Sequence, residues 1–543
     1  KQWLVQFDHL TNTWCWDIDK IDQQHTTDNV IDLMVEKIRD LSPKSYQLAC
    51  SGACIGNQFD LNTLAAINFQ TPENAANDLW ELLKSGLLTP VDDRYDWAEH
   101  LSQPTIKGND QFKMAGPVPS YRFSHDRIQQ AAYSLLPDAD KHRIHLSVGQ
   151  SLLDSHDDSC IDDILFNVAN HLNLAASFSN VSSNPMQLAE LNLRSGKKAK
   201  ASAAFASSFQ YLNNGIESVN ESHWSSHYKL MLQLHTETME LACINADFET
   251  MDTLTSTLLE NADALIDKIP VYETRIRAFI SKDDSAGAVK EALQALKHLG
   301  VDIMFNPEFS DVEKALVAAG QSLSSRSPMS LMDLPEMDDP HLLAAMRILN
   351  QILSAAYQSC PLLFPIIVSN MIQLSIKHGN CPGSTFAYST YGLVLCGVVG
   401  DIETGYQFGQ LSIKLLERLN TDEFKAKTLY GVYVFVYHWK QHIDKTITPL
   451  KNIFQIGLTT GDFEYAGWAG MMINVHSFFA GNPVDKLEKD TQEYLQKIKH
   501  MTQKTAYLHT CIFIQTLSSL RKPFDKQMFS DPQAFYGDYY SEQ

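Results

Sequence analysis

Apolar residues recur at helical spacing through most of this chain, and turn signals separate the helical segments at fairly regular intervals. From about Asp140 onward, nearly every segment has the periodicity of an amphipathic helix. The turn signals lie about 34–40 residues apart, which is the range of helix-pair repeats. Residues 188–543 are therefore predicted to form a superhelix of degenerate tetratricopeptide-like helix pairs, and residues 140–187 are predicted to form connecting helices.

The segment 392–411 shows the repeat pattern well. Gly392 is expected where two helices of a pair approach closely, Gly400 and Asp401 are expected in the turn, and Phe408 is expected to pack back. Two further stretches share this pattern, 196–215 and 461–481. Only part of the tetratricopeptide consensus is present, so the number of repeats stays open.

Prolines interrupt the pattern once within the repeats. Pro307, Pro328 and Pro335 fall within residues 306–340. Because proline removes a backbone donor and breaks helices, an irregular insertion is expected there.

The N-terminal part has a different pattern, in which short helices are combined with strands. Polar and apolar residues alternate over 6–17, which predicts a hairpin, and Asp28 is expected to cap a helix over 30–41. Three further helices are predicted, followed by two short strands that a polar insertion separates: Pro43 to Cys54, Asp60 to Ile67, Glu73 to Ser85, Gly86 to Pro90 and Tyr121 to Phe123. Helices followed by a two-stranded wing indicate a winged-helix domain over residues 28–139. The predicted fold class is mainly α, with this domain preceding the repeats.

The charge and composition of the chain exclude several classes of partner. The formal net charge is −21, so no nucleic acid and no anionic membrane surface is expected as a partner. No apolar run reaches the roughly 18 residues of a membrane span, and no signal peptide is seen. The nine cysteines are scattered, which fits a reducing compartment, and a cytoplasmic location is expected. Because the chain begins with Lys1, it is expected to be part of a longer protein.

No catalytic motif stands out in the sequence. Gly196 and Lys197 form the only Gly-Lys pair, and Leu191 stands where a phosphate-binding loop requires glycine. His142 with His145, and His223 with His227, have spacings compatible with a metal but lack the glutamate of a zinc-peptidase helix, so packing roles are favoured. We expect no cofactor and no metal in this chain, and no enzymatic activity is assigned to it.

The segment from Tyr121 to Pro137 contains the triplet Ser124-His125-Asp126. Histidine kinases carry their phosphoacceptor in a similar triplet, but there it lies within a helix and an Arg-Thr-Pro-Leu-like turn follows. Here Arg127-Ile128-Gln129-Gln130-Ala131 follows, so a phosphoacceptor role is not favoured.

Several short strings, in this order, resemble one family of very large signalling proteins. Among them are Trp14-Cys15-Trp16-Asp17, Ala53 to Phe59, Lys377-His378-Gly379-Asn380 and Gly461 to Ala466. They resemble the winged-helix and helical-repeat region of proteins that combine a serine/threonine kinase-like domain, an AAA-type ATPase and a sensor histidine kinase. The resemblance implies that residues 1–27 are the C-terminal remnant of an ATPase module. It also implies that the parent protein binds ATP or ADP and is a kinase, and that this chain is a regulatory segment whose partner is another protein or a neighbouring kinase or ATPase domain.

The segment from Tyr121 to Pro137 also resembles part of the signalling ATPases of the apoptosome and resistance-protein type. In those proteins a histidine of the winged helix contacts the ADP phosphate, so the resemblance implies that His125 and Asp126 sense the nucleotide state. Imidazole can donate a hydrogen bond to a phosphate oxygen. The alternative is that Asp126 caps a helix over Arg127 to Leu135 and that His125 packs beneath it.

Three further alternatives stay open. The aromatic stripe of residues 430–439 is either part of a binding face or part of the core. A winged helix can also belong to a DNA-binding transcription regulator, although the expected recognition helix carries Glu73, Asp78 and Glu81 against Lys84 alone. A hydrolytic site assembled from distant repeats would leave no local motif.

Overall fold

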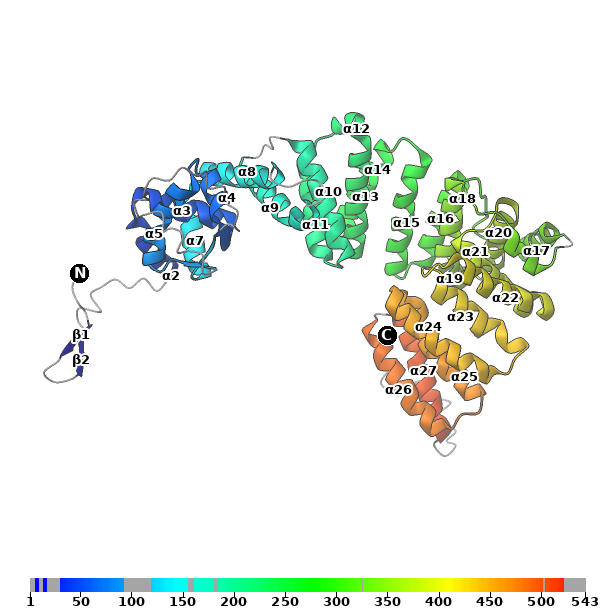
Figure 1. Ribbon diagram of the computed structural model, residues 1–543. Coiled ribbons are helices and arrows are strands. Elements are labelled where there is room, and N and C mark those ends of the chain that lie inside the picture. Colours follow the sequence, from blue (N-terminus) through cyan, green and yellow to red (C-terminus); the bar gives the residue numbers. More distant parts are fainter. Residues whose placement is uncertain are drawn as a thin grey trace, which may run out of the picture. The chain divides into compact units, whose positions relative to one another are not determined.

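A computed structural model describes residues 5–8, 13–16, 30–91, 119–154, 161–179, 184–324, 326–501 and 503–521. The described residues are mainly α-helical, as predicted. The chain divides into two compact units, residues 1–254 and 255–543 (Figure 1).

The first unit combines short strands with helices of 4 to 19 residues. Its elements are β1 Val5–Asp8, β2 Thr13–Trp16, α2 Val30–Arg39, α3 Pro43–Ile55, β3 Gln58–Asp60, α4 Leu61–Ile67, α5 Pro72–Lys84, β4 Leu88–Pro90, β5 Ser120–Phe123, α7 Asp126–Ser134, α8 Asp138–Asp154, α9 Ile161–Ser179, α10 Pro185–Ala201, α11 Phe205–Glu217, α12 His223–Ser226 and α13 Tyr228–Ile244. Helix α14, Phe248–Asn261, spans the division between the units.

The predicted N-terminal hairpin is present. Strands β1 and β2 pair antiparallel, with Val5 opposite Trp16 and Asp8 opposite Thr13. The predicted cap at Asp28 lies outside the described residues.

A three-stranded antiparallel sheet follows, in the order β3-β5-β4. Gln58 lies opposite Arg122 on one side of β5, and Leu88 lies opposite Phe123 on the other. The sequence predicts two strands here, so β3 is an addition. The hydrophobic pattern does not reveal β3, because three residues are too few to show a period of two.

Local sequence signals explain why the helices beside this sheet begin where they do. Ser42, Asp60 and Thr71 act as N-caps of α3, α4 and α5, and Asp60 Oδ1 accepts from the Thr63 amide at 2.8 Å. The Phe59 ring packs against Gly52 of α3, where a Cβ would lie 2.8 Å from the ring. The core of this part therefore lies between the sheet and α3.

The following helices of the first unit pack in sequence-adjacent pairs. Helix α8 packs on α9, α9 on α10, and α10 on α11. A Cβ on Gly149 of α8 would lie 2.6 Å from Leu172 of α9, and one on Gly196 of α10 would lie 2.5 Å from Leu212 of α11. The pairs α8–α9 and α10–α11 therefore each cross at a glycine, which lets the two helices approach closely.

The named elements of the second unit, within its described residues, are all helices. Its elements are α15 Leu265–Ser281, α16 Ser285–His298, α17 Phe309–Leu323, η2 Pro328–Asp333, α18 Pro340–Gln351, α19 Leu353–Ser359, α20 Leu363–His378, α21 Pro382–Val394, η3 Leu395–Val399, α22 Ile402–Leu419, α23 Lys425–Phe435, η4 Tyr437–Trp439, η5 Ile443–Thr446, α24 Ile447–Thr460, α25 Phe463–Phe479, α26 Val484–His500 and α27 Lys504–Arg521. Consecutive helices again pack as pairs: α15 on α16, α21 on α22, α24 on α25, and α26 on α27. This arrangement is consistent with tetratricopeptide-like repeats.

The pair α21 and α22 has the close approach, turn and packing that were predicted for residues 392–411. A Cβ on Gly392 would lie 2.8 Å from the Gly405 carbonyl oxygen, so the two helices meet at Gly392. Gly400 has a left-handed φ of 84°, and Asp401 caps α22. Phe408 is fully buried, and its ring lies edge-on to Tyr391 with centroids 4.9 Å apart.

The stretch 306–340 is more regular than its prolines indicate. It contains α17, which packs on α20, and the 3₁₀ helix η2. Pro307 precedes α17 and Pro328 begins η2, so both prolines occupy positions that need no intrahelical donor.

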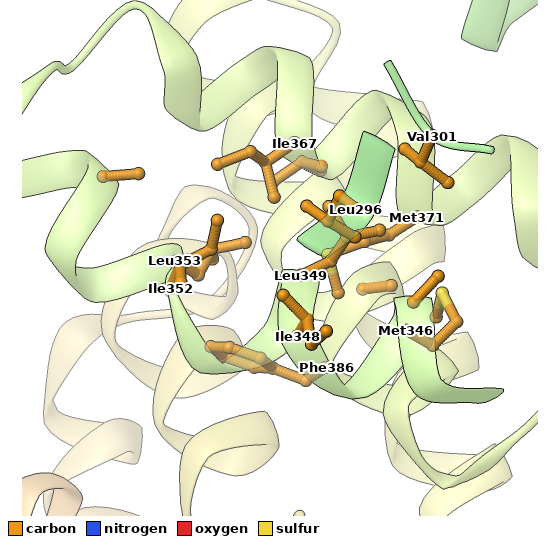
Figure 2. Close-up of a cluster of buried hydrophobic side chains, with 14 of the residues drawn as sticks. Leu296, Val301, Met346, Ile348, Leu349, Ile352, Leu353, Ile367, Met371 and Phe386 are labelled. Carbon is orange, nitrogen blue, oxygen red and sulfur yellow. The ribbon is translucent and has the colours of Figure 1, made fainter. Parts of the chain in front are cut away.

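The largest core cluster of the second unit joins several helix pairs. Figure 2 shows Leu296, Leu349, Ile352, Ile367 and Phe386 converging from α16, α18, α20 and α21 and from the α18–α19 join. All five side chains are at most 3% exposed. Continuous burial across successive pairs is what holds a stack of helical repeats together.

Candidate functional site

The sequence-predicted site residues lie where β5 turns into α7. His125 is the N-cap of α7, and its Nδ1 accepts a hydrogen bond from the Arg127 amide at 3.1 Å. The preceding Ser124 amide donates to the Leu87 carbonyl at 3.0 Å, which ties the turn to the sheet. The capping role considered for Asp126 therefore belongs to His125, and Asp126 lies in the first turn of α7.

His125 and Asp126 are both exposed. Because Nδ1 of His125 accepts a hydrogen bond, the proton of the neutral ring lies on Nε2. This nitrogen is a hydrogen-bond donor at the protein surface. Packing of His125 beneath the helix, the other part of the alternative, is not observed.

A cavity of about 420 Å³ lies further along α7. It is lined by the end of α3 and by α7, α8 and α9. Gln129 Nε2 donates to the Ala53 carbonyl at 3.2 Å and so fixes α7 to α3 beside the cavity. The lining includes Gly56, Gln129, Gln130, Tyr133, His145, Asn167, Asn170 and His171.

Two histidines and a tyrosine form a hydrogen-bonded chain on the wall of this cavity. The Tyr133 hydroxyl lies 3.1 Å from His145 Nε2, and His145 Nδ1 lies 3.0 Å from His171 Nδ1. His171 also bonds to the backbone of Ile55. If Tyr133 donates to His145, His145 to His171, and His171 to the Ile55 carbonyl, each hydrogen bond in the chain has one donor and one acceptor with both rings neutral.

The surroundings favour this neutral state. Burial, followed by the neighbouring His171 and Lys141, lowers the pKa of His145 to about 4. Burial also lowers the pKa of His171. The ammonium group of Lys141 lies over the Tyr133 ring, 5.1 Å from its centroid. Its positive charge repels a proton on His145 and so favours the neutral ring. The sequence pairs His145 with His142, but the structure pairs it with His171 of the next helix.

A second cavity, of about 450 Å³, lies among the helix pairs of the second unit. Four separate parts of the unit line it: the end of α15, the α18–α19 join, the start of α23, and the turn from α24 into α25. Its polar lining residues include Arg277, Ser281, Asn350, Gln351, Ser354, Glu423, Lys427, Thr460, Asp462, Glu464 and Tyr465.

Lys427, Asp462 and Glu464 face this second cavity, and none of the three forms an ion pair within 4.0 Å in the described part of the chain. Burial lowers the pKa of Lys427, even though Asp462 and Glu464 act in the opposite direction. Burial raises the pKa of Glu464, whose carboxylate accepts a hydrogen bond from the Ser354 side chain. Burial likewise raises the pKa of Asp462, although Lys427 opposes that shift. For Lys427, Asp462 and Glu464, burial therefore disfavours the charged form more than the neighbouring charges favour it.

Asn350, one of the lining residues, has a buried and unsatisfied amide oxygen. Asn350 is 7% exposed, and its Nδ2 donates to the Met346 carbonyl at 2.6 Å. Its Oδ1 has no hydrogen-bond partner among the described residues. A buried acceptor without a donor costs about 1–3 kcal/mol, so this oxygen marks a position where a donor would be favourable.

The other candidates that the sequence offers have structural roles where the chain is described. Gly196 and Lys197 lie inside α10, as expected, and do not form a phosphate loop. His142 Nδ1 bonds to the Ala175 carbonyl at 2.8 Å, and His223 Nδ1 accepts from the Asn220 amide at 3.0 Å. No group of three metal-ligating side chains occurs in the described ranges.

The aromatic stripe divides between core and surface. Tyr430 is 7% exposed, whereas Phe435 and Trp439 are about half exposed, at 40% and 45%. The stripe is thus neither wholly core nor wholly a binding face.

Comparison with known proteins finds a distant similarity to part of a signalling protein. It is 23% identical over 561 aligned residues to hybrid signal transduction histidine kinase G of Dictyostelium discoideum, an alignment that covers 93% of this chain and 16% of that protein. The chain thus spans about one sixth of the length of this curated relative. No protein-family model matches it.

A solved structure also aligns with the chain. It is a Signal Transduction ATPase with Numerous Domains (STAND) protein with a tetratricopeptide repeat sensor from Pyrococcus horikoshii. The identity is 12% and the TM-score 0.40, with 96% of this chain and 66% of that one covered. None of the helices in the described part of this chain combines the length and hydrophobicity needed to span a bilayer.

Proposed function

We propose that this chain is the regulatory and partner-binding segment of a multidomain signalling protein. In this proposal, binding on the helical repeats controls a neighbouring nucleotide-binding or kinase domain. The observation that carries it is the similarity of 93% of the chain to a part of a hybrid histidine kinase. The absence of a nucleotide-binding motif from the sequence fits a segment that controls such a domain and is distinct from it.

The architecture of the second unit supports the binding role. Stacked helix pairs offer extended surfaces built from successive repeats. The cavity of about 450 Å³ is built in this way, because α15, α18, α23 and α25 each contribute to it. A ligand or partner seated there would contact several repeats at once and bias their relative packing.

We further propose that residues 28–139 form a winged helix. The order α3, β3, α4, α5, β4, β5, with β5 between the other two strands, is the order of helices and strands in a winged helix. DNA binding is not favoured, because α5 carries Glu73, Asp78 and Glu81 against Lys84. Glu81 accepts from the Ser42 amide at 3.1 Å and so serves the join to α3.

Within this domain, we propose that His125 and Asp126 sense the state of ADP or ATP held by a neighbouring domain. His125 is exposed, and its Nε2 can donate to a phosphate oxygen while Nδ1 caps α7. In the longer protein, His125→Ala should raise basal kinase output. His125→Asn is the matched control, because asparagine preserves an N-cap acceptor but removes the imidazole.

The two variants separate sensing from capping. If output rises in both, the imidazole itself holds the protein inactive. If output rises only in His125→Ala, loss of the cap explains the effect and the sensor role is wrong.

The regulatory role has its own test. Deletion of residues 255–521 from the longer protein should change the rate of kinase autophosphorylation, measured by phosphate incorporation. Equal rates with and without the repeats would refute the proposed function.

A further inference from the structure

We propose that the cavity between α15, α18, α19, α23 and the start of α25 binds a small zwitterion of the α-amino acid class. Its ammonium group would lie toward Glu464 and Asn350 Oδ1, and its carboxylate toward Lys427. This ligand class adds to the proposed function of the repeats. Binding of the ligand does not depend on that function, whereas a regulatory effect of the binding does.

The geometry of the charges gives the first argument. Lys427 belongs to α23, whereas Asp462 and Glu464 lie at the start of α25, and all three line the same cavity. In the described part of the chain, no carboxylate oxygen lies within 4.0 Å of Lys427 Nζ, which lies 4.2 Å from the centroid of the Phe424 ring. Opposite charges that face one cavity without direct pairing are complementary to a ligand that carries both signs.

The unsatisfied oxygen of Asn350 gives an independent argument. The side chain is more than nine-tenths buried, and its amide group is already oriented by the bond from Nδ2 to Met346. The free Oδ1 can only accept a hydrogen bond. A ligand ammonium carries several donors, so it can satisfy this oxygen and a carboxylate together.

The size and walls of the cavity fit a small molecule. A volume of about 450 Å³ falls within the range of small-molecule sites, about 300–1,000 Å³. Tyr465 is held by edge-on contacts with Phe386 and Tyr430, with centroids 5.8 Å and 5.4 Å away. Together with Ile280, it gives the cavity an apolar wall for a ligand side chain.

Calorimetric titration of the full 543-residue chain would test the proposal. Each of the common L-amino acids is titrated singly, and the tightest binder is then compared with its two analogues that lack either the amino or the carboxyl group. Saturable binding is expected for at least one amino acid. Each analogue should bind at least about tenfold more weakly, because each leaves one charge of the cavity unmatched.

Three variants assign the binding to this cavity. Glu464→Gln and Lys427→Gln should each weaken binding by at least about tenfold. Lys425→Met is the matched control, because Lys425 is on the same helix, pairs with Asp422 at 3.4 Å and does not line the cavity. Glu464→Gln is nearly isosteric, so it reports on charge even if Lys427→Gln fails to fold.

Absence of saturable binding for all the common amino acids would overturn the proposal. Equal binding by the single-charge analogues, or unchanged binding in Glu464→Gln, would also overturn it. The proposed function fails separately. If an amino acid binds this chain but neither it nor deletion of the repeats alters kinase output in the longer protein, the site stands and the regulatory role does not.

Discussion

Lowering the pH from about 7.5 to about 5 should destabilise the packing of α8 on α9 through His145. This histidine is 2% exposed and has a pKa of about 4 in the folded chain, because burial, His171 and Lys141 all disfavour its charged form. In the unfolded chain the pKa returns to about 6.5. The unfolded state therefore binds the proton more readily, so stability is complete above about pH 6.5 and is lost as the pH falls toward 4.

The size of the loss follows from the two pKa values. Each unit of difference corresponds to about 1.4 kcal/mol once both transitions are passed. Between pH 7.5 and pH 5 only part of the unfolded-state titration is used, and the expected loss is about 2 kcal/mol. His171 adds to the loss in the same direction, because burial lowers its pKa as well.

Hydrogen exchange of the α8 and α9 amides, corrected for the intrinsic pH dependence of exchange, measures this loss locally. His145→Gln should lose most of the pH dependence, because the glutamine does not titrate. His142→Gln is the control, since His142 also lies on α8 and bonds to α9 but is not part of the chain of rings. A wild-type change below about 0.5 kcal/mol, or an unchanged slope in His145→Gln, would refute the reasoning.

Three further outcomes are expected. Gly392→Ala should destabilise the second unit by about 1–3 kcal/mol in thermal melts, because its Cβ would lie 2.8 Å from a backbone oxygen, whereas Gly397→Ala, which meets no atom within 4 Å, should not. Asn380→Ala should cost about 2–4 kcal/mol by the same measurement, since it leaves Tyr388 and the Leu331 carbonyl without their hydrogen-bond partner, and equal melting of wild type and variant would count against this. A low-salt gel shift of this chain with duplex DNA should show no specific complex, and a specific complex would favour the transcription-regulator alternative.

Several elements of the fold could be predicted because each depends on residues close together in sequence. The β1–β2 hairpin follows from alternation, and the Gly400–Asp401 turn follows from a residue that tolerates positive φ next to a capping side chain. The close approach at Gly392 could also be predicted, because a glycine within an otherwise apolar helix indicates a crossing. In each case the local pattern and the tertiary contact require the same residue.

The string Lys377-His378-Gly379-Asn380 shows how a recognisable motif can owe its residues to packing alone. A Cβ on Gly379 would lie 2.3 Å from the Pro335 carbonyl oxygen, so only glycine fits there. Asn380 donates to the Leu331 carbonyl and accepts from Tyr388, each at 2.7 Å, and its amide donates to Pro335. This residue thus fixes the end of the 306–340 insertion to the turn between α20 and α21, and the motif needs no catalytic explanation.

The chemistry of the two cavities could not be predicted, because each group is ordinary in its own helix. In the sequence, Lys427 is typical of a solvated lysine, Glu464 of an acidic first-turn residue of α25, and Asn350 of a polar residue near the end of α18. Their significance arises only when α18, α23 and α25 come together around one cavity, which removes water from these polar groups. In a stack of repeats, residues close together in sequence determine how each helix pair folds. The lining of a cavity of this kind comes from residues that are far apart in sequence. Sequence periodicity therefore predicts the fold of such a chain better than it predicts its ligand.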